Sequence, residues 1–179
     1  KTTPWTGRKY ELLKLLLYNN LAVYSSHLPL DCHPKLGNNA QLATALGLKK
    51  CRPFFFEKGR DIGLCTDAQI TRSRLINQLE KAVGGPVTVL PGGPKTCRKI
   101  GIVTGGAGAQ LTKAAAEGVD TFITGEGPHH TFALAEEAGI NVLYAGHYAT
   151  ETFGVKALAG HLAKKYRLSW QFLDHPTGL

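Results

Sequence analysis

The sequence predicts an α/β fold with a mixed, mostly parallel sheet. From residue 99 onward, short apolar segments of strand length alternate with longer segments of helical spacing, a rhythm that is typical of crossover units. Each predicted strand in this part except the last is followed by a loop that contains glycine. A chain of 179 residues with 43% hydrophobic content is also long enough to bury a sizeable core.

The first 48 residues indicate a helix, a strand and a second helix. Leucines at helical spacing predict a helix over residues 8–18, and two asparagines follow as its stop. The apolar residues 21–24 predict a short strand that leads into a polar segment. Glycine and two asparagines at 37–39 predict a turn and cap before a short helix over residues 40–46, which Gly47 closes.

Residues 49–93 are expected to form an intervening subdomain. Three phenylalanines at 54–56 are followed by a predicted helix over residues 67–83, with Thr66 as its cap, and by a brief strand over residues 87–90. Pro91, two glycines and Pro94 then form the clearest breaker cluster in the chain. We therefore expect a boundary near residue 93, which divides the chain into residues 1–48, 49–93 and 94–179.

The last part carries the regular alternation. Each strand is short and apolar, and each helix is long enough to cross back over the sheet, so a largely parallel arrangement is expected. The predicted order is strand 99–103, helix 109–117, strand 121–124, helix 131–138, strand 141–144, helix 150–164 and strand 168–173.

Composition excludes several classes of protein. No apolar run approaches the roughly 18 residues that cross a bilayer, and no signal-peptide core follows the first charges, so a cytoplasmic protein without membrane segments is expected. The four cysteines form no CxxC pair, which favours reduced, buried thiols over disulfides or a thiolate zinc site. The net charge of +8 is spread over short basic groups without interleaved aromatics, so direct nucleic-acid binding is not expected.

Side chains of the metal-ligating type follow three of the predicted strands. Because such loops open on one edge of a parallel sheet, residues far apart in sequence can surround one ion there. They are His27, Asp31 and His33 after the first strand, Glu126, His129 and His130 after residue 124, and His147 and Glu151 after residue 144.

The pair His147 and Glu151 is the sharpest of these signals. A spacing of four places an imidazole and a carboxylate on one face of a helix. Nitrogen and oxygen ligands without thiolates suit Zn, Mn, Fe or Ni, and the residue types do not choose among these metals. The alternative is a hydrogen-bonded loop histidine and an acidic residue that favours a helix N-terminus.

Gly105, Gly106 and Gly108 follow the strand that ends at residue 103 and have two interpretations. Backbone amides in such a loop can contact a substrate phosphate. A tight turn between strand and helix is the other interpretation, and the spacing does not match the full dinucleotide fingerprint.

Four segments together resemble the NIF-three-like family, whose bacterial members are called GTP cyclohydrolase 1 type 2 homologues. They are YSSHLPLD from residue 24, GNNAQLATALGL from residue 37, TGE from residue 124 and AGHYATETFGVKAL from residue 145. The resemblance runs from about residue 8 to residue 176, and the order of HLPLD and GHxATE is specific to the family.

The resemblance implies a NIF-three-like fold of two intertwined α/β halves, assembled as a homohexamer with two divalent metal ions per subunit. It gives Asp31, His147 and Glu151 as metal ligands, with Asp31 able to bridge two ions. His27 matches a family histidine that touches a ligand or carries a proton, so His27 and Glu151 are the expected catalytic residues. Residues 1–48 would then be the C-terminal part of the first half, and residues 94–179 the second half with its metal-ligand loop.

The chain departs from the family pattern in one place. Members carry a further pair of adjacent histidines before the helix that here begins near Arg8, and no such pair precedes it. The sequence also contains no methionine, so we expect a fragment that lacks an N-terminal part.

Two functions are therefore expected. The first is a metal-dependent hydrolase-like protein, of the GTP cyclohydrolase type, that acts on a nucleotide or another phosphate-bearing metabolite. The second is a non-catalytic, metal-binding hexameric scaffold or regulator that binds protein or nucleic acid.

Overall fold

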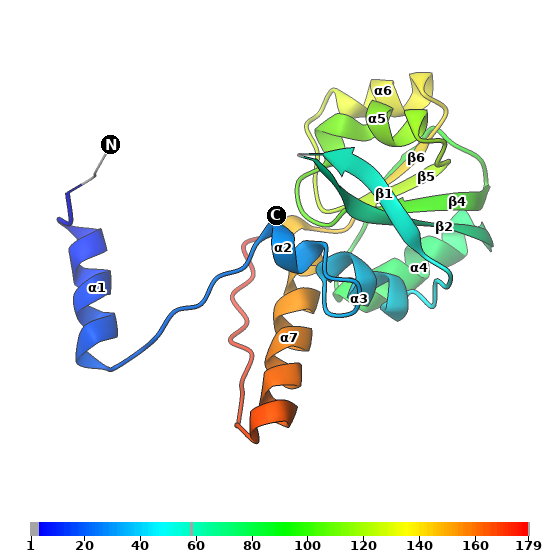
Figure 1. Ribbon diagram of the computed structural model, residues 1–179. Coiled ribbons are helices and arrows are strands. Elements are labelled where there is room, and N and C mark those ends of the chain that lie inside the picture. The colour runs from blue at the N-terminus through cyan, green and yellow to red at the C-terminus, as the bar shows by residue number, and fades with distance from the viewer. Residues whose placement is uncertain (1–3, 58, 179) are drawn as a thin grey trace.

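The computed structural model describes residues 4–57 and 59–178 (Figure 1). A six-stranded sheet forms its centre, in the order β1-β2-β4-β5-β6-β3. The strands are β1 (Arg52–Glu57), β2 (Arg60–Thr71), β3 (Thr88–Pro91), β4 (Thr96–Ile102), β5 (Thr121–Thr124) and β6 (Asn141–Tyr144). The helices are α1 (Arg8–Tyr18), α2 (Leu28–Asp31), α3 (Asn38–Ala45), α4 (Arg72–Val83), the 3₁₀ turn η1 (Gly108–Gln110), α5 (Leu111–Ala116), α6 (Thr131–Glu137) and α7 (His147–Tyr166).

The predicted α/β class is confirmed, and the sheet is mixed. Parallel pairing is confined to its middle, where β4, β5 and β6 lie side by side. The β1–β2, β2–β4 and β6–β3 pairs are antiparallel. Strands from residues 49–93 and strands after residue 93 therefore form one sheet.

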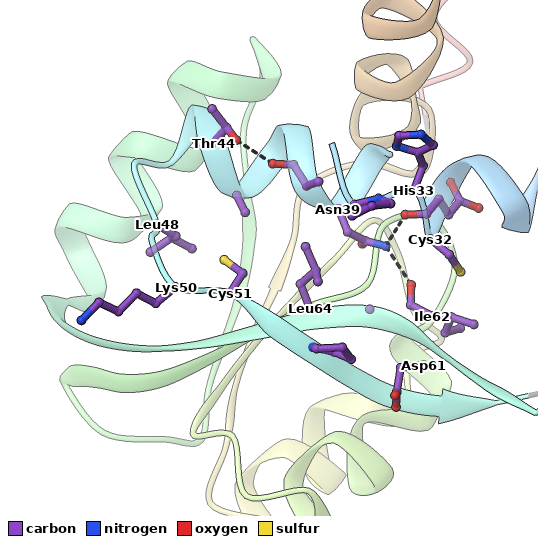
Figure 2. A pocket seen from close by; sticks show the side chains of 16 residues that line it. Cys32, His33, Asn39, Thr44, Leu48, Lys50, Cys51, Asp61, Ile62 and Leu64 are labelled. Atoms are coloured by element: carbon purple, nitrogen blue, oxygen red, sulfur yellow. Dashed lines mark hydrogen bonds between the residues drawn. The ribbon is translucent and has the colours of Figure 1, made fainter. Parts of the chain in front are cut away.

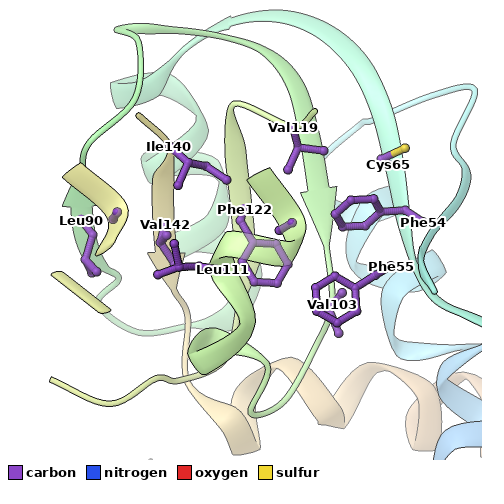
Figure 3. Packing of buried hydrophobic residues seen from close by; sticks show 12 residues of the cluster. Phe54, Phe55, Cys65, Leu90, Val103, Leu111, Val119, Phe122, Ile140 and Val142 are labelled. Atoms are coloured by element: carbon purple, nitrogen blue, oxygen red, sulfur yellow. The ribbon is translucent and has the colours of Figure 1, made fainter. Parts of the chain in front are cut away.

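Two hydrophobic clusters fill the space on the two faces of the sheet. Phe122 and Ile123 are neighbours in β5 and belong to different clusters, because successive side chains of a strand point to opposite faces. Figure 3 shows the first cluster, in which Phe122 packs near Leu111 of α5 and Phe55 of β1. The second cluster joins the sheet to α3 and α4. Helices thus cover both faces, with α5 and α6 together on one (Figure 1).

The backbone of Phe55 takes an unusual conformation within β1. Its φ is 68°, in the left-handed region that an aromatic residue rarely adopts. Its amide donates to Glu117 Oε2 at 2.8 Å, and the Phe56 amide donates to Glu117 Oε1 at 3.3 Å. The Phe55 ring is fully buried and stacks on Phe122 at 5.7 Å between centroids. The Glu117 carboxylate at the end of α5 therefore fixes the backbone of β1 at Phe55 and Phe56.

Two predicted strands are wrong in this structure, for the same physical reason. Residues 21–24 are extended but unpaired, and Tyr24 is 81% exposed. Residues 168–173 are likewise outside the sheet and run back along α7 (Figure 1). An apolar segment becomes a strand only when a neighbouring strand supplies the ladder of hydrogen bonds, and among the described residues neither segment has such a neighbour.

The predicted helix 67–83 begins later than expected. Residues 67–71 continue β2, because the pairing with β4 extends to Thr71 opposite Thr96. Thr71, and not Thr66, caps α4 by accepting a hydrogen bond from the Arg74 amide at 3.4 Å. The other predicted helices and the predicted strands of residues 87–144 are confirmed. Helix 8–18 and strands 121–124 and 141–144 have the predicted bounds, and the remaining elements have shifted ends.

Helix α1 stands apart from the rest of the structure (Figure 1). None of its residues is buried, and Leu17 is 72% exposed. A long extended segment connects it to α2 (Figure 1). Over the described part of the chain, no helix has both the length and the apolar character needed to cross a membrane.

Candidate metal centre

Three side chains from the two ends of the chain meet beside the sheet. His27 directly precedes α2, Asp31 is the last residue of α2, and Glu151 lies in the first turns of α7. One potential ligand atom from each lies within 4.8 Å of the other two. Asp31 is buried, Glu151 is partly buried and His27 is exposed, so the group opens to solvent on the His27 side. We call these three residues the ligand cluster.

His147 lies against the ligand cluster through Glu151. The i,i+4 spacing in α7 brings His147 Nε2 to 3.4 Å from Glu151 Oε1. The other ring nitrogen, Nδ1, lies 2.7 Å from Glu126 Oε1. A carboxylate at Nδ1 fixes the ring orientation and leaves Nε2 facing Glu151, an arrangement that is common among metal-binding histidines. The structure thus brings Glu126 to the site as well.

Asn38 fixes the carboxylate of Asp31. Its Nδ2 donates to Asp31 Oδ1 at 2.6 Å, and its Oδ1 accepts from the Gly154 amide at 2.5 Å. Asn38 is only 4% exposed, so neither bond competes freely with water. One side chain thereby ties α2 to α7, the two elements that carry the acidic members of the ligand cluster.

Asn39 fixes the backbone around Asp31. Its Nδ2 donates to Ile62 O at 2.8 Å and Asp31 O at 3.3 Å, as the dashed lines in Figure 2 show. Its Oδ1 accepts from the Thr104 amide at 2.9 Å. Asn39 is 2% exposed, and it connects α2, β2 and the loop after β4. The position of Asp31 is therefore set by two adjacent buried amides.

Gly105 makes room for Glu151. Its φ is +78°, and a Cβ built on it would collide with Glu151 Oε1. Its amide donates to Thr150 Oγ1 at 3.1 Å, which fastens the loop to the first turn of α7. Only glycine satisfies both the conformation and the space at this position. The loop after β4 therefore passes directly beside the ligand cluster.

The chemistry of the cluster suits a divalent cation. Burial raises the pKa of Glu151, the neighbouring His147 lowers it, and the nearby Asp31 carboxylate raises it. The carboxylates of Asp31 and Glu151 lie close together with little exposure to solvent, so they repel one another unless a cation neutralises them. One imidazole and two carboxylates form a donor set that Zn, Mn, Fe or Ni accepts. The residues present thus fit a metal ion.

A cavity of about 270 Å³ adjoins the cluster. His27, Asp31, His147 and Glu151 all line it. The loop after β4 and η1 provide much of the remaining wall, and α2, α3, β1 and β2 contribute one residue each; this further lining is Leu28, Asn39, Glu57, Ile62, Val103, Thr104, Gly106, Ala107 and Gln110. The ligand cluster thus has space beside it for a small ligand.

Known families and proteins resemble this chain over nearly its whole length. The family description for Duf34/NIF3 (NGG1p interacting factor 3) matches residues 1–177. The chain belongs to the Duf34/NIF3 family. It is 38% identical to a protein of Deinococcus radiodurans and 41% identical to one of Halobacterium salinarum, both named GTP cyclohydrolase 1 type 2 homolog. These matches cover 97% of this chain and 67% and 70% of the two relatives, so the chain spans about two thirds of their length.

Solved structures of the Duf34/NIF3 family superpose closely. A crystal structure of a Thermus thermophilus protein shares 38% identity with a TM-score of 0.89, covering 100% of this chain and 71% of that one. Reduced HcgD from Methanocaldococcus jannaschii shares 28% identity with a TM-score of 0.78, covering 92% of this chain and 65% of that one. The fold of the described residues is therefore the Duf34/NIF3 fold.

Not every predicted ligand of this Duf34/NIF3 chain reaches the site. His33 Nδ1 instead accepts hydrogen bonds from the amides of Lys35 and Leu36, which closes a local turn. His129 lines a different cavity with Phe132. A third cavity, of about 390 Å³, is lined by Asp31, His33 and Asn39 among others and is shown in Figure 2.

Sequence reasoning missed the residues that hold the ligands. Asn38 and Asn39 were expected to form a turn and cap, yet both lie in the first turn of α3 and are buried. A signal was present: two consecutive amides a few residues after an aspartate, in a motif shared with the family. Thr104 and Thr150 gave no comparable signal, because single threonines beside glycine loops are common.

Proposed function

We propose that this chain supplies the donor set of a metal-dependent hydrolase-like protein. The observation that carries the proposal is the approach of ligand atoms from His27, Asp31 and Glu151 to within 4.8 Å of one another. His147 adds a fourth donor through Nε2, which lies next to Glu151. These four residues include the three ligands that the family resemblance implies, Asp31, His147 and Glu151.

The proposed roles follow from burial and contacts. Asp31 and Glu151 provide the anionic ligands, and Asn38 holds the Asp31 carboxylate in one orientation. The chemistry that a divalent metal supplies at such a site is activation of water, by lowering its pKa, and neutralisation of charge on substrate oxygens. His27 is exposed at the open side of the cluster, where an imidazole can carry protons between the cavity and solvent.

The proposed substrate is a nucleotide or another phosphate-bearing metabolite. The relatives' name, GTP cyclohydrolase 1 type 2 homolog, supports this class. The cavity beside the ligand cluster has room for one phosphate-sized group, and a larger substrate would extend through its open side. We place this activity in the cytoplasm and in a homohexamer with two ions per subunit, as the family resemblance implies.

The test is conversion of GTP by protein loaded with one metal at a time. Wild type and Glu151→Gln are compared, because glutamine keeps the shape of the side chain and removes the charge that the metal requires. Metal-dependent conversion of GTP in wild type, lost in Glu151→Gln, supports the proposal. A loaded wild-type protein that leaves GTP and other nucleoside phosphates unchanged would contradict it.

A second candidate function is a non-catalytic metal-binding scaffold. The exposed apolar residues of α1 and the segment after it favour it, since Leu17 and Tyr24 are 72% and 81% exposed. Exposed apolar surface of this kind marks interaction sites. The scaffold predicts metal binding without turnover, together with loss of assembly when a chelator removes the metal. Light scattering of the metal-loaded and chelated protein measures that difference.

A further inference from the structure

Thr104 carries a buried hydroxyl group without a partner. The residue lies shortly after β4 and is 8% exposed. Among the described residues its Oγ1 makes no hydrogen bond and is shielded from solvent. The backbone here is firmly held, because the Thr104 amide donates to Asn39 Oδ1 and the next amide donates to Thr150 Oγ1.

An unpaired hydroxyl in such a place has a measurable cost. Leaving a buried polar group unsatisfied destabilises a protein, and a valine of the same shape would avoid that loss. Unsatisfied groups are rare in native structures and call for a specific explanation, such as a bound water, an ion or a ligand. Two backbone hydrogen bonds, from the amides of Thr104 and Gly105, hold the loop at this position.

The position of Thr104 indicates which explanation applies. It lines the cavity that His27, Asp31 and Glu151 also line. A turn of about 120° around its Cα–Cβ bond carries the hydroxyl to another staggered position without any backbone movement. Gly106, on the same wall, has a backbone amide that donates to no described residue. The loop after β4 therefore has a hydroxyl and an amide available next to the ligand cluster.

We propose that the Thr104 hydroxyl donates a hydrogen bond to an oxyanion, of the phosphate class, held at the His27–Asp31–Glu151 cluster. This inference rests on the proposed metal site, because the two carboxylates repel an anion until a cation neutralises them. A hydroxyl donor adds a charge-assisted bond to an anionic oxygen, and the Gly106 amide offers a second. Thr104 thereby orients the anion relative to the metal ligands.

The test is the affinity of inorganic phosphate for the Mn²⁺-loaded protein, measured by calorimetry. Thr104→Val removes the hydroxyl and keeps the shape, and Thr104→Ser restores the hydroxyl. Thr112→Val serves as the matched control, because Thr112 is exposed on α5. We expect phosphate to bind about tenfold more weakly to Thr104→Val, and equally well to wild type, Thr104→Ser and Thr112→Val.

Two further measurements separate this inference from the proposed metal site. Metal content must be the same in wild type and Thr104→Val, and the urea midpoint of the metal-free Thr104→Val protein must not fall, since no internal hydrogen bond is lost. Equal phosphate affinity in wild type and Thr104→Val would overturn the inference and leave the hydroxyl serving a buried water. Loss of metal in Thr104→Val would overturn it as well.

If wild type binds no metal, the proposed metal site fails and this inference fails with it, because the two carboxylates then repel the anion. Normal metal binding with equal phosphate affinity in wild type and Thr104→Val rejects this inference alone.

Discussion

Asn38 donates a hydrogen bond of 2.6 Å to the Asp31 carboxylate. The same amide accepts from the backbone of α7 at Gly154, so it holds the first and last parts of the chain together at the ligand cluster. Asn38 therefore sets the geometry of the ligand cluster, although it contributes no ligand atom to that cluster.

Replacing Asn38 with alanine should weaken metal binding. The Asp31 carboxylate loses its orienting donor, and loss of such a partner typically lowers metal affinity by about 10–100-fold. Calorimetric titration with Zn²⁺ or Mn²⁺ measures the change. Asn19→Ala is the matched control, because the Asn19 side chain makes an exposed bond to Leu15 O at the end of α1, a helix that stands apart from the rest of the structure (Figure 1). Equal metal affinity in Asn38→Ala and Asn19→Ala would contradict this role.

Gly105→Ala should damage the site beyond its effect on stability. Gly139→Ala is the control, because Gly139 also has a positive φ, +65°, but has open space around its Cα. Both variants are expected to lose about 1–2 kcal/mol of unfolding free energy through the left-handed conformation. Only Gly105→Ala pushes against Glu151. Parallel urea denaturation and metal titration separate the two effects, and an unchanged metal affinity in Gly105→Ala would refute the contact.

His27→Gln distinguishes two roles for His27. If the imidazole is a ligand, as its place in the cluster favours, metal content falls with the substitution. If it only carries a proton, the metal stays and turnover falls. We expect metal affinity to drop at least about tenfold. His33→Gln is the matched control, since the His33 ring accepts bonds from its own turn.

Glu117→Gln should destabilise the fold without touching the metal centre. The carboxylate accepts from two consecutive amides of β1, one of them in the strained Phe55 conformation. A glutamine keeps one acceptor oxygen and loses the charge, so we expect a loss of about 1–3 kcal/mol. Chemical denaturation measures it. Glu137→Gln, on an exposed part of α6, should change stability by less than about 0.5 kcal/mol, and an equal effect in both would contradict the proposed hold on β1.

Much of the fold could be predicted from local pattern, and the failures share a cause. β5 and β6 are short, mostly apolar and buried, and their sequences alone were enough to predict them as strands. Residues 21–24 and 168–173 carry the same kind of pattern, but a strand depends on a partner that the pattern itself does not reveal. Residues 67–71 show the reverse case. They were predicted to be helical, but they continue β2 because this strand pairs with β4 as far as Thr71.

Part of the candidate site could likewise be predicted from the sequence, and part could not. His147 and Glu151 could be found because their spacing and chemistry are both visible in the sequence. The approach of His27 to Glu151 depends on how α2 meets α7, and the buried side chain of Asn38 joins these two helices. Long-range bonds of this kind leave little trace in one sequence. The unpaired, buried hydroxyl of Thr104 could be identified only from the structure.

The measurement that tests the central claim most directly is the metal content of the purified chain by elemental analysis. Wild type is compared with an Asp31→Asn, Glu151→Gln double variant, both prepared without chelator or metal-affinity resin and then incubated with excess Zn²⁺, Mn²⁺, Fe²⁺ or Ni²⁺ before desalting. We predict at least one ion per wild-type chain and none in the variant. An equal content in both proteins, or no metal in either, would contradict a metal site at His27, Asp31 and Glu151.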